Sequence, residues 1–484
     1  MKKRVVSKLF LYRYRFYIGY LFLGLAFLSL VFFLPLLSPA GLSESEMSSV
    51  VTSYNLHFSS ITTGDLVDLP YHIVQKIFIL IFGMNIYTIK LPSIIIGAIL
   101  GFLIVLLLNR WFKSNVALLS SILTVLSVPF LYLVGSGTPA IMLVFWPTLL
   151  LWLGSKIQGV KKPRPLYSFI FAICLISSIF TPHMVYLDAF IVIFALINPH
   201  LRFTIKTLPR GPFIVTSLFV LACLAMLVVN IASNPSIGFE LLFSKDYVAG
   251  DFFANLKLAF APFFNWGSPL EGTLLTPLIS LASLFLAFSG LFSTTKGFFA
   301  SRNSIASFFI FFTIILSGFD PDSSMLIILP LAILIAHGLR YTLEKWYNIF
   351  PENPYARVLG VFPIAIFIGI MITSGLTHYI FGYRYAPAVA NQFNDDLSLV
   401  ISNLDDTTTL LLGENSLEYA FYEVYEDRTH DIDLTAFSSQ IDTETVATLG
   451  NSIRPEGNWQ LSQIITSPKS DNSDRIYIYT SIKN

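Results

Sequence analysis

Apolar stretches of about 20 residues recur along most of this chain, and few charges interrupt them. An α-helix needs about 20 predominantly apolar residues to cross the hydrocarbon core of a bilayer. Inside that core a helix satisfies its own backbone hydrogen bonds, which water cannot do there. The repeated stretches therefore predict a polytopic α-helical membrane protein.

The composition supports this fold class. The 484 residues are 55% hydrophobic and 12% charged, whereas soluble domains carry about 25% charged residues, and the mean hydropathy is +0.70. Both cysteines, Cys174 and Cys223, lie in apolar stretches, which favours neither a disulfide framework nor a zinc site. We expect a large membrane domain over residues 1–376 and a separate polar domain over residues 377–484.

The first fifteen residues hold six Lys and Arg and no acids, and Phe16–Leu37 is apolar. The apolar core of a signal peptide is shorter, about 7–15 residues, so we interpret this segment as an uncleaved first span. Ten further spans bring the predicted total to about eleven. They are centred near residues 92–108, 116–134, 139–154, 166–180, 184–197, 212–232, 272–293, 304–318, 323–338 and 358–376.

Loop charge predicts the orientation of these spans. The N-terminus and every second loop hold 20 of the 30 Lys and Arg, whereas the opposite loops before residue 377 hold four. Basic loops stay on the cytoplasmic side. We therefore expect an integral protein of the plasma membrane with a cytoplasmic N-terminus and an extracytoplasmic C-terminal domain.

The predicted first outer loop, residues 38–91, is unusually polar beside its apolar neighbours. Within it, residues 70–83 place His72, Gln75 and Lys76 on one stripe of an otherwise apolar helix. That pattern predicts a helix lying in the membrane interface. The loop also carries four acids: Glu44, Glu46, Asp65 and Asp68.

The C-terminal segment has a different composition, with 16 acids and 6 bases from Thr377 onward. Residues 391–404 and 416–427 have helical patterns, and residues 407–413 and 474–482 have strand patterns. We predict a small α/β domain. It contains no phosphate-binding glycine motif and no metal-spaced His and Cys set, so a separate activity is not indicated.

Three stretches resemble the C-type superfamily of membrane glycosyltransferases. GLSESEMSSVV at residues 41–51 lies where that superfamily has a Gly-Leu-x-x-Asp-Glu motif. LPYHIVQKIF and the following residues to 112 match its Pro-Tyr-led interfacial helix, Phe-Gly turn and basic-Leu-Pro-Ser start of the second span. DPDSSMLIILPLAILIAHGL at residues 320–339 is similar to its late outer segment. The similarity is clearest over residues 16–115 and is greatest to the family 39 and aminoarabinose-transferase branch, which includes protein O-mannosyltransferases.

The resemblance implies a C-type fold and transfer of a sugar from a polyprenyl-phosphate carrier to an extracytoplasmic glycan, lipid or protein of the cell envelope. Membrane lipid is an expected partner and nucleic acid is not. Because an acceptor hydroxyl is a weak nucleophile, a carboxylate must take its proton. Glu46 is the first candidate base and Glu44 the second; the family's other acid falls on Ser45. Displacement assisted by one carboxylate inverts the anomeric centre.

The leaving phosphate requires positive charge near it. Lys76, Lys90 and His183 are the candidate donor-phosphate ligands on the outer side. The basic residues that the family often has nearby are replaced by Leu69 and by the acids of the late outer loop. A divalent cation, Mg²⁺ or Mn²⁺, is the alternative, since hard cations favour oxygen ligands; no other cofactor is expected. Its candidate ligands are Glu44, Asp65, Asp68, Asp320 and Asp322.

Structural roles compete with each of these assignments. Ser43 and Glu46 have the spacing of a helix capping box, and the two lysines are equally consistent with interfacial anchors. His183 is more often a local hydrogen-bonding group than a catalytic one, and the acids of FDPDSS also suit an ordinary turn. At the level of the whole protein, the alternatives are a lipid-sugar flippase or transporter and an inactive scaffold of the same fold.

Overall fold

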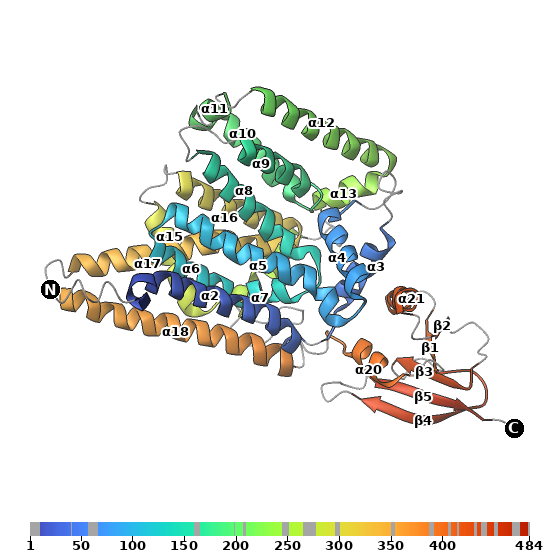
Figure 1. Cartoon of the computed structure of the whole chain (residues 1–484). Coiled ribbons are helices and arrows are strands. Elements are labelled where there is room, and N and C mark those ends of the chain that lie inside the picture. Colours follow the sequence, from blue (N-terminus) through green and yellow to red (C-terminus); the bar gives the residue numbers. More distant parts are fainter. Residues whose placement is uncertain are drawn as a thin grey trace.

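The protein is described here from a computed structural model. It is mostly helical, with a small sheet near the C-terminus (Figure 1). The structure describes residues 10–39, 41–56, 66–158, 165–197, 199–206, 210–243, 251–264, 277–295, 301–349, 354–386, 392–404, 408–413, 416–429, 433–436, 443–449, 454–466 and 475–482.

Among these residues, six helices are long and apolar enough to cross a membrane. They are α2 (Phe10–Leu37), α5 (Ile86–Trp111), α8 (Met142–Gln158), α12 (Arg210–Ser233), α17 (Ile328–Ile349) and α18 (Pro354–Tyr385). A seventh span is a broken one, in which α6 (Ser114–Val125) and α7 (Val128–Gly135) meet at a bend of 61°.

Four of the predicted spans coincide with helices whose apolar part is shorter than 18 residues. They are α9 (Pro165–Ser178), α10 (Met184–Ile197), α15 (Leu281–Thr295) and α16 (Ser301–Phe319). The six long helices, the broken pair and these four account for all eleven predicted spans, so the polytopic helical fold class is confirmed. A helix of 14 residues, such as α9 or α10, is only about 21 Å long, which is less than the hydrocarbon thickness of about 30 Å.

Shorter elements complete the helical part on both of its ends. They are α3 (Glu44–Asn55), α4 (Leu69–Phe82), η2 (Pro139–Ile141), α11 (Pro199–Lys206), α13 (Pro235–Phe243), α14 (Phe252–Phe264) and η3 (Pro321–Ile327). The helix α4 corresponds to the interfacial helix predicted at residues 70–83. In Figure 1, α3, α4 and α13 lie at the end of the bundle that faces the C-terminal domain, while α11 and the beginning of α2 lie at the other end.

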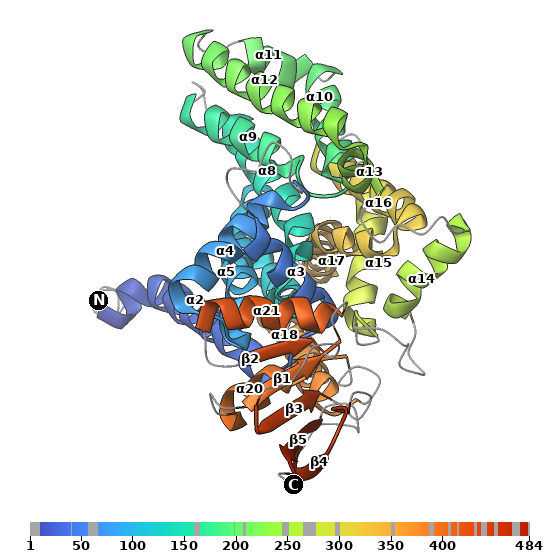
Figure 2. The same ribbon diagram turned by 90° about the vertical axis from the view of Figure 1, so that its right-hand side faces the viewer.

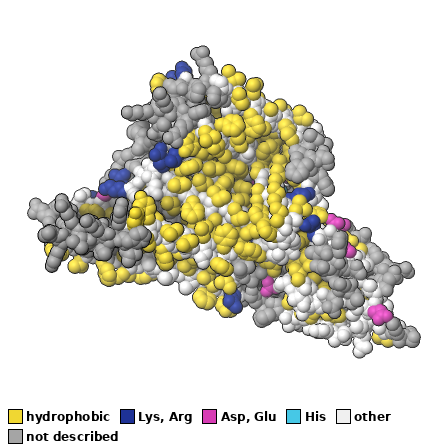
Figure 3. Space-filling view, viewed as in Figure 1, with side chains coloured by type: hydrophobic (Ala, Val, Ile, Leu, Met, Phe, Trp, Pro, Cys, Tyr) yellow, Lys and Arg dark blue, Asp and Glu magenta, His cyan; other side chains and the backbone are white. Residues whose placement is uncertain are grey.

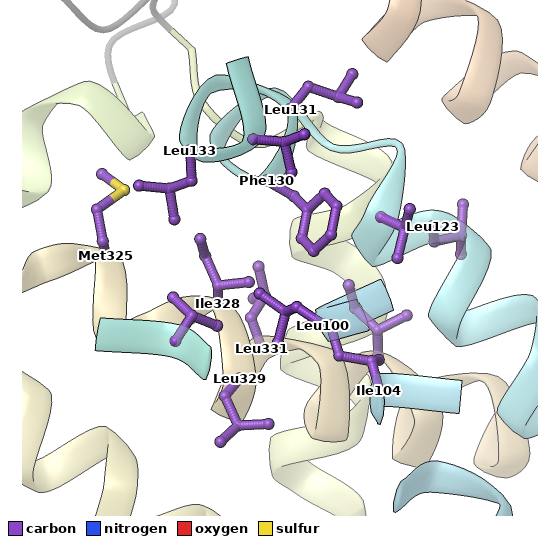
Figure 4. Close-up of a cluster of buried hydrophobic side chains, with 14 of the residues drawn as sticks. Leu100, Ile104, Leu123, Phe130, Leu131, Leu133, Met325, Ile328, Leu329 and Leu331 are labelled. Atoms are coloured by element: carbon purple, nitrogen blue, oxygen red, sulfur yellow. The ribbon is translucent and has the colours of Figure 1, made fainter. Parts of the chain in front are cut away.

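The main core lies where α5, the broken pair α6–α7 and α17 meet. Figure 4 shows Leu100 and Ile104 of α5 facing Phe130 of α7 and Ile328 and Leu331 of α17. All five side chains are buried. Because protein interiors are packed as densely as organic crystals, this cluster fixes the position of the C-terminal end of α7. The backbone just beyond that end contacts Glu46.

The tightest helix pair is α15 against α17, which touch through two glycines. A Cβ atom on Gly290 would overlap the carbonyl of Leu334, and one on Gly338 would overlap the carbonyl of Leu286. Small residues permit such close backbone approach between membrane helices. The position of α17 is therefore set on one side by backbone contact.

The surface of the helical part is strongly apolar. Figure 3 shows hydrophobic side chains spread over its broad face, and the acidic side chains visible there lie mainly toward the C-terminal domain. The helices α2, α12 and α18 leave most of their apolar residues exposed. This surface suits lipid contact, since soluble proteins rarely expose large apolar patches.

The described part of the C-terminal domain is a mixed sheet with two helices. Its strands are β1 (Thr408–Leu412), β2 (Asp433–Ala436), β3 (Thr445–Leu449), β4 (Trp459–Thr466) and β5 (Arg475–Ser481), in the order β2-β1-β3-β5-β4. The first three are parallel, and β5 runs antiparallel to both β3 and β4. The helices are α20 (Asp396–Asn403) and α21 (Leu417–Thr429). The predicted small α/β domain is thus present, although α18 continues eight residues beyond the predicted start at 377.

This domain packs directly on the segment that follows α2. Leu42 and Asn394 form an isolated antiparallel bridge, with N–O distances of 2.8 and 2.9 Å. One buried apolar cluster combines Met47 and Val50 of α3 with Phe421 of α21. Figure 2 shows α21 lying across the end of the helical part, beside α3. The segment around Leu42, α3 and the C-terminal domain therefore form one packed unit.

Candidate active site

Glu46 lies in the first turn of α3 and is fully buried. Ser43 caps this helix, and its backbone N–H donates to Glu46 Oε2 at 2.8 Å, which completes a capping box. The second oxygen, Oε1, accepts the N–H of Gly137 at 2.6 Å, just beyond α7. The capping-box interpretation is confirmed. The same carboxylate also links the start of α3 to the residues that follow α7, at the end of the broken span.

Lys90 of α5 is buried beside this carboxylate. Its ammonium lies 3.7 Å from Glu46 Oε1 and donates to the carbonyls of Pro39 and Gly41, each at 2.8 Å. A buried ion pair holds its place only when further hydrogen bonds satisfy both partners. Here they do, so this predicted phosphate ligand ties α5 to the segment after α2.

A buried polar network joins α3 to α4 next to this pair. Gln75 Oε1 accepts hydrogen bonds from Ser49 at 2.8 Å and Ser53 at 2.6 Å, and Gln75 Nε2 donates to the Gly137 carbonyl at 3.1 Å. Ser53 also contacts His72 Nδ1 at 2.7 Å. The polar stripe predicted for α4 therefore points into the protein rather than toward water. Satisfied buried networks rigidify the elements that they connect.

Lys76 lies on the same helix and is only half-buried. Its ammonium donates to the carbonyls of Tyr54 at 2.8 Å and Leu56 at 2.6 Å, at the C-terminal end of α3. Burial lowers the pKa of this lysine. An ammonium has three N–H donors, so one N–H remains beyond these two carbonyls.

Glu44 is exposed on the first turn of α3 and faces the C-terminal domain. Glu418 on α21 is exposed at its surface but partly desolvated; this desolvation raises its pKa, and the negative charge of Glu44 adds to that rise. Ser45, which occupies the position of the family's other acid, is exposed as well. Of the two candidate bases, Glu44 is therefore the one that solvent reaches.

His183 and Asp320 meet at a second polar position, on the same end of the bundle. The distance from His183 Nε2 to Asp320 Oδ2 is 2.7 Å, and both side chains are buried. His183 lies in the turn between α9 and α10, and Asp320 directly precedes η3. The two residues are 137 positions apart in the sequence. The sequence named both residues but in different roles, as a phosphate ligand and as a metal or substrate ligand.

Backbone strain marks this same position. Among the described residues other than glycine, only Asp68 (φ 52°) and His183 (φ 65°) have left-handed backbones. The two positions are linked, because the Asp68 N–H donates to the carbonyl of Phe180 at 2.7 Å. Left-handed backbone is uncommon outside glycine, and strained residues concentrate at functional sites.

The other predicted ligands have mixed outcomes. Asp65 lies outside the described residues, as does the side chain of Asp322. No three His, Cys, Asp or Glu within the described ranges come close enough to hold a metal ion. The divalent cation stays a prediction, with Glu44, Asp65, Asp68, Asp320 and Asp322 as its candidate ligands.

Sequence reasoning missed the groups that complete these contacts. The N–H of Gly137 and the carbonyls of Pro39 and Gly41 carry no side-chain signal. Glu418 lies far along the chain from Glu44, in a domain to which no active-site role was assigned. No local pattern could have revealed these partners.

Comparisons with known proteins agree with this architecture. The family model described as dolichyl-phosphate-mannose-protein mannosyltransferase matches residues 70–229. The chain is a relative of the C-type membrane glycosyltransferases. Its matched region starts in α4 and ends in α12, so it includes Lys76, Lys90 and His183. No curated protein sequence matches the chain significantly.

Two solved structures of ArnT from Cupriavidus metallidurans share the fold of this C-type relative. The structure bound to undecaprenyl phosphate aligns with a TM-score of 0.58 and 12% identity, covering 95% of this chain and 98% of ArnT. The apo structure aligns with a TM-score of 0.55 and 12% identity, covering 96% and 98%. The similarity extends over the membrane part and the C-terminal domain, which confirms the C-type fold for the whole chain.

Proposed function

We propose that this protein transfers a sugar from a polyprenyl-phosphate carrier to an acceptor on the extracytoplasmic side of the plasma membrane. The acceptor class is a glycan, lipid or protein of the cell envelope. The observation that carries the proposal is the family match over residues 70–229, because it covers α4, α5 and the turn that carries His183, which build part of the polar end of the bundle. The ArnT structure with undecaprenyl phosphate supports a lipid-phosphate donor.

The chemistry follows from the location of the site. Nucleotide sugars are cytoplasmic, so transfer on the outer side requires a donor whose lipid lies among the helices and whose sugar lies outside. The acceptor oxygen attacks the anomeric carbon while a base removes its proton. Such general-base assistance contributes about 10²–10⁴-fold in rate, and a single displacement inverts the anomeric centre.

The two carboxylates proposed as the base differ in their freedom to act. Glu46 accepts hydrogen bonds on both oxygens and is fully buried, whereas Glu44 is exposed. A base must come within hydrogen-bond reach of the proton that it abstracts. Of the two carboxylates, Glu44 is therefore the one that is free to approach a substrate, and the contacts of Glu46 give it a positioning role.

Charge for the departing phosphate has two proposed sources. Lys76 retains one N–H and is half-exposed in α4, while the hydrogen bonds of Lys90 go to the segment after α2. We propose Lys76 as the protein contact for the phosphate. Mg²⁺ or Mn²⁺ at Asp68 and Asp65 is the alternative source, and transfer assays with EDTA followed by either cation distinguish the two.

A second candidate function is a binding scaffold without catalysis. It is favoured by one observation, the serine at position 45 beside a glutamate whose oxygens are already occupied. In that case the exposed acids of α3 and α21 bind a partner, and no sugar is transferred.

The experiment uses purified protein in proteoliposomes with radiolabelled undecaprenyl-phosphate mannose or dolichyl-phosphate mannose. Total cell-envelope lipid, glycan and protein fractions serve as acceptors. Transfer of label to one fraction supports the enzyme. Label that crosses the bilayer without transfer supports a flippase, and acceptor binding without transfer or crossing supports the scaffold.

A further inference from the structure

We infer that the imidazole of His183, held by Asp320, accepts the proton of the acceptor hydroxyl. This inference rests on the proposed glycosyl transfer, and it assigns the base to neither of the two glutamates. Asp320 occupies one ring nitrogen of His183 and no described group occupies the other, whereas both oxygens of Glu46 are occupied.

The contact with Asp320 sets the tautomer of the ring. A carboxylate only accepts hydrogen bonds, so the nitrogen beside it must carry the proton. His183 Nε2 lies 2.7 Å from Asp320 Oδ2 and is therefore the N–H. In the neutral ring this leaves the lone pair on Nδ1. A carboxylate that orients an imidazole in this way also stabilises the imidazolium formed when Nδ1 takes a proton.

Nδ1 itself is buried and has no hydrogen-bond partner within the described part of the chain. Buried polar atoms without partners are rare in native proteins, and each requires an explanation such as a bound group or a catalytic role. A substrate hydroxyl that donates to Nδ1 satisfies this atom. The unoccupied nitrogen is thus the atom that the proposed reaction needs.

The backbone at His183 holds the ring in this place. Its N–H donates to the Leu241 carbonyl of α13 at 3.0 Å, and the adjacent Thr181 hydroxyl accepts from the Trp146 indole at 3.1 Å. Contacts to α13 and α8 thereby fix a turn whose φ of 65° is unfavourable for histidine. Strain that is held in place by several neighbours is typical of functional positions.

Glu46 provides the contrast. Both of its oxygens accept backbone N–H groups, from Ser43 and Gly137, and Lys90 lies beside it. A carboxylate whose lone pairs are occupied in this way is a poor proton acceptor for a substrate, whereas Nδ1 of His183 is not occupied by any described group.

The step balances without any further reactant. The acceptor oxygen forms a bond to the anomeric carbon, and its proton moves to Nδ1. The bond between that carbon and the phosphate oxygen breaks, and its electron pair leaves with the phosphate. The imidazolium then returns its proton to water, which restores the neutral ring beside the Asp320 carboxylate.

The test measures transfer of label from undecaprenyl-phosphate mannose to a cell-envelope extract. His183→Asn is the main variant, because asparagine tolerates left-handed backbone and so preserves the turn without supplying a base. We expect transfer to fall about 10²–10⁴-fold. Added imidazole should raise the transfer rate of His183→Ala at least about tenfold, because a diffusing base can take the place of the missing ring. Asp320→Asn should slow transfer with less restoration, since the ring remains in place.

His72→Ala is the matched control, because His72 is also buried but bonds to Ser53 through Nδ1. Any loss in that variant should not respond to imidazole. Transfer by His183→Asn within about threefold of wild type overturns the inference, as does a loss in His183→Ala that imidazole does not relieve. If the wild-type protein transfers no label under any condition, the proposed function fails and the inference fails with it.

Discussion

The ammonium of Lys90 lies 3.7 Å from the carboxylate of Glu46, and both side chains are buried. Forty-four residues separate them, and they connect α5, α3 and the end of α7. The family resemblance named one residue as a phosphate ligand and the other as the base. Their contacts instead hold α3 and the segment after α2 on the helical bundle.

Lys90→Met should destabilise the protein by about 3–5 kcal/mol, because it leaves the Glu46 charge buried without its cation. The double variant Glu46→Gln/Lys90→Met should recover part of this loss. Denaturant unfolding in detergent measures the free energy of unfolding. Glu344→Gln is the control, since its pair with Arg340 is exposed and such pairs contribute about 0–1 kcal/mol. Equal effects of Lys90→Met and Glu344→Gln would contradict the buried pair.

Glu418→Gln should raise the melting temperature at pH 7.5 and leave it nearly unchanged at pH 4. Partial burial and the charge of Glu44 raise the folded-state pKa of Glu418 above its usual value of 4.5. The folded state therefore holds this proton more tightly than the unfolded state does, so the group costs stability as pH rises from about 4.5 through the raised pKa. Below that window the cost disappears. A pH series of thermal unfolding curves measures it.

Glu44→Gln should give a smaller change of the same sign, because it removes only the second cause of the shift. A fall in melting temperature for both variants at pH 7.5 would mean that the two carboxylates attract a common partner instead of opposing one another.

Gly290→Ala should lower the melting temperature sharply, because the added methyl group overlaps the Leu334 carbonyl across the α15–α17 contact. Overpacking of this kind costs about 1–3 kcal/mol. Gly24→Ala in α2 is the matched control, since a Cβ there meets no atom within 4 Å. Equal melting temperatures of Gly290→Ala and Gly24→Ala would contradict the close α15–α17 contact.

Lys76→Ala should loosen the C-terminal end of α3. The variant leaves the Tyr54 and Leu56 carbonyls without their donor, and a lost hydrogen bond of this kind costs about 0.5–1.5 kcal/mol. Faster amide hydrogen exchange over residues 51–56 would show it. Lys76→Arg, which keeps the charge and N–H donors, should exchange like wild type; faster exchange in it would show that the ammonium geometry itself matters.

The sequence predicted the elements well because their signals are local. Hydropathy located all eleven apolar segments, and the polar stripe of α4 was evident from its spacing. The ends were less accurate: α15 begins at Leu281, although its predicted span began near residue 272. Hydropathy measures how apolar a segment is and does not report where its backbone turns.

The sequence could name candidate site residues, but it could not show which of them contact each other. His183 and Asp320 were both recognised, but their contact joins residues 137 positions apart, and no local pattern encodes that pairing. The direction of the α4 stripe was also misjudged, because Gln75 faces buried serines of α3. Amphipathic spacing identifies a polar face but does not say whether water or another helix covers it.

The most direct measurement of the central claim is sugar transfer by the purified protein in proteoliposomes, using radiolabelled undecaprenyl-phosphate mannose and dolichyl-phosphate mannose with cell-envelope acceptors. The account predicts that label passes from one of these carriers to an acceptor, and that His183→Asn abolishes the transfer while the protein stays folded. Absence of label on every acceptor, from a folded wild-type protein supplied with Mg²⁺ or Mn²⁺, would contradict it.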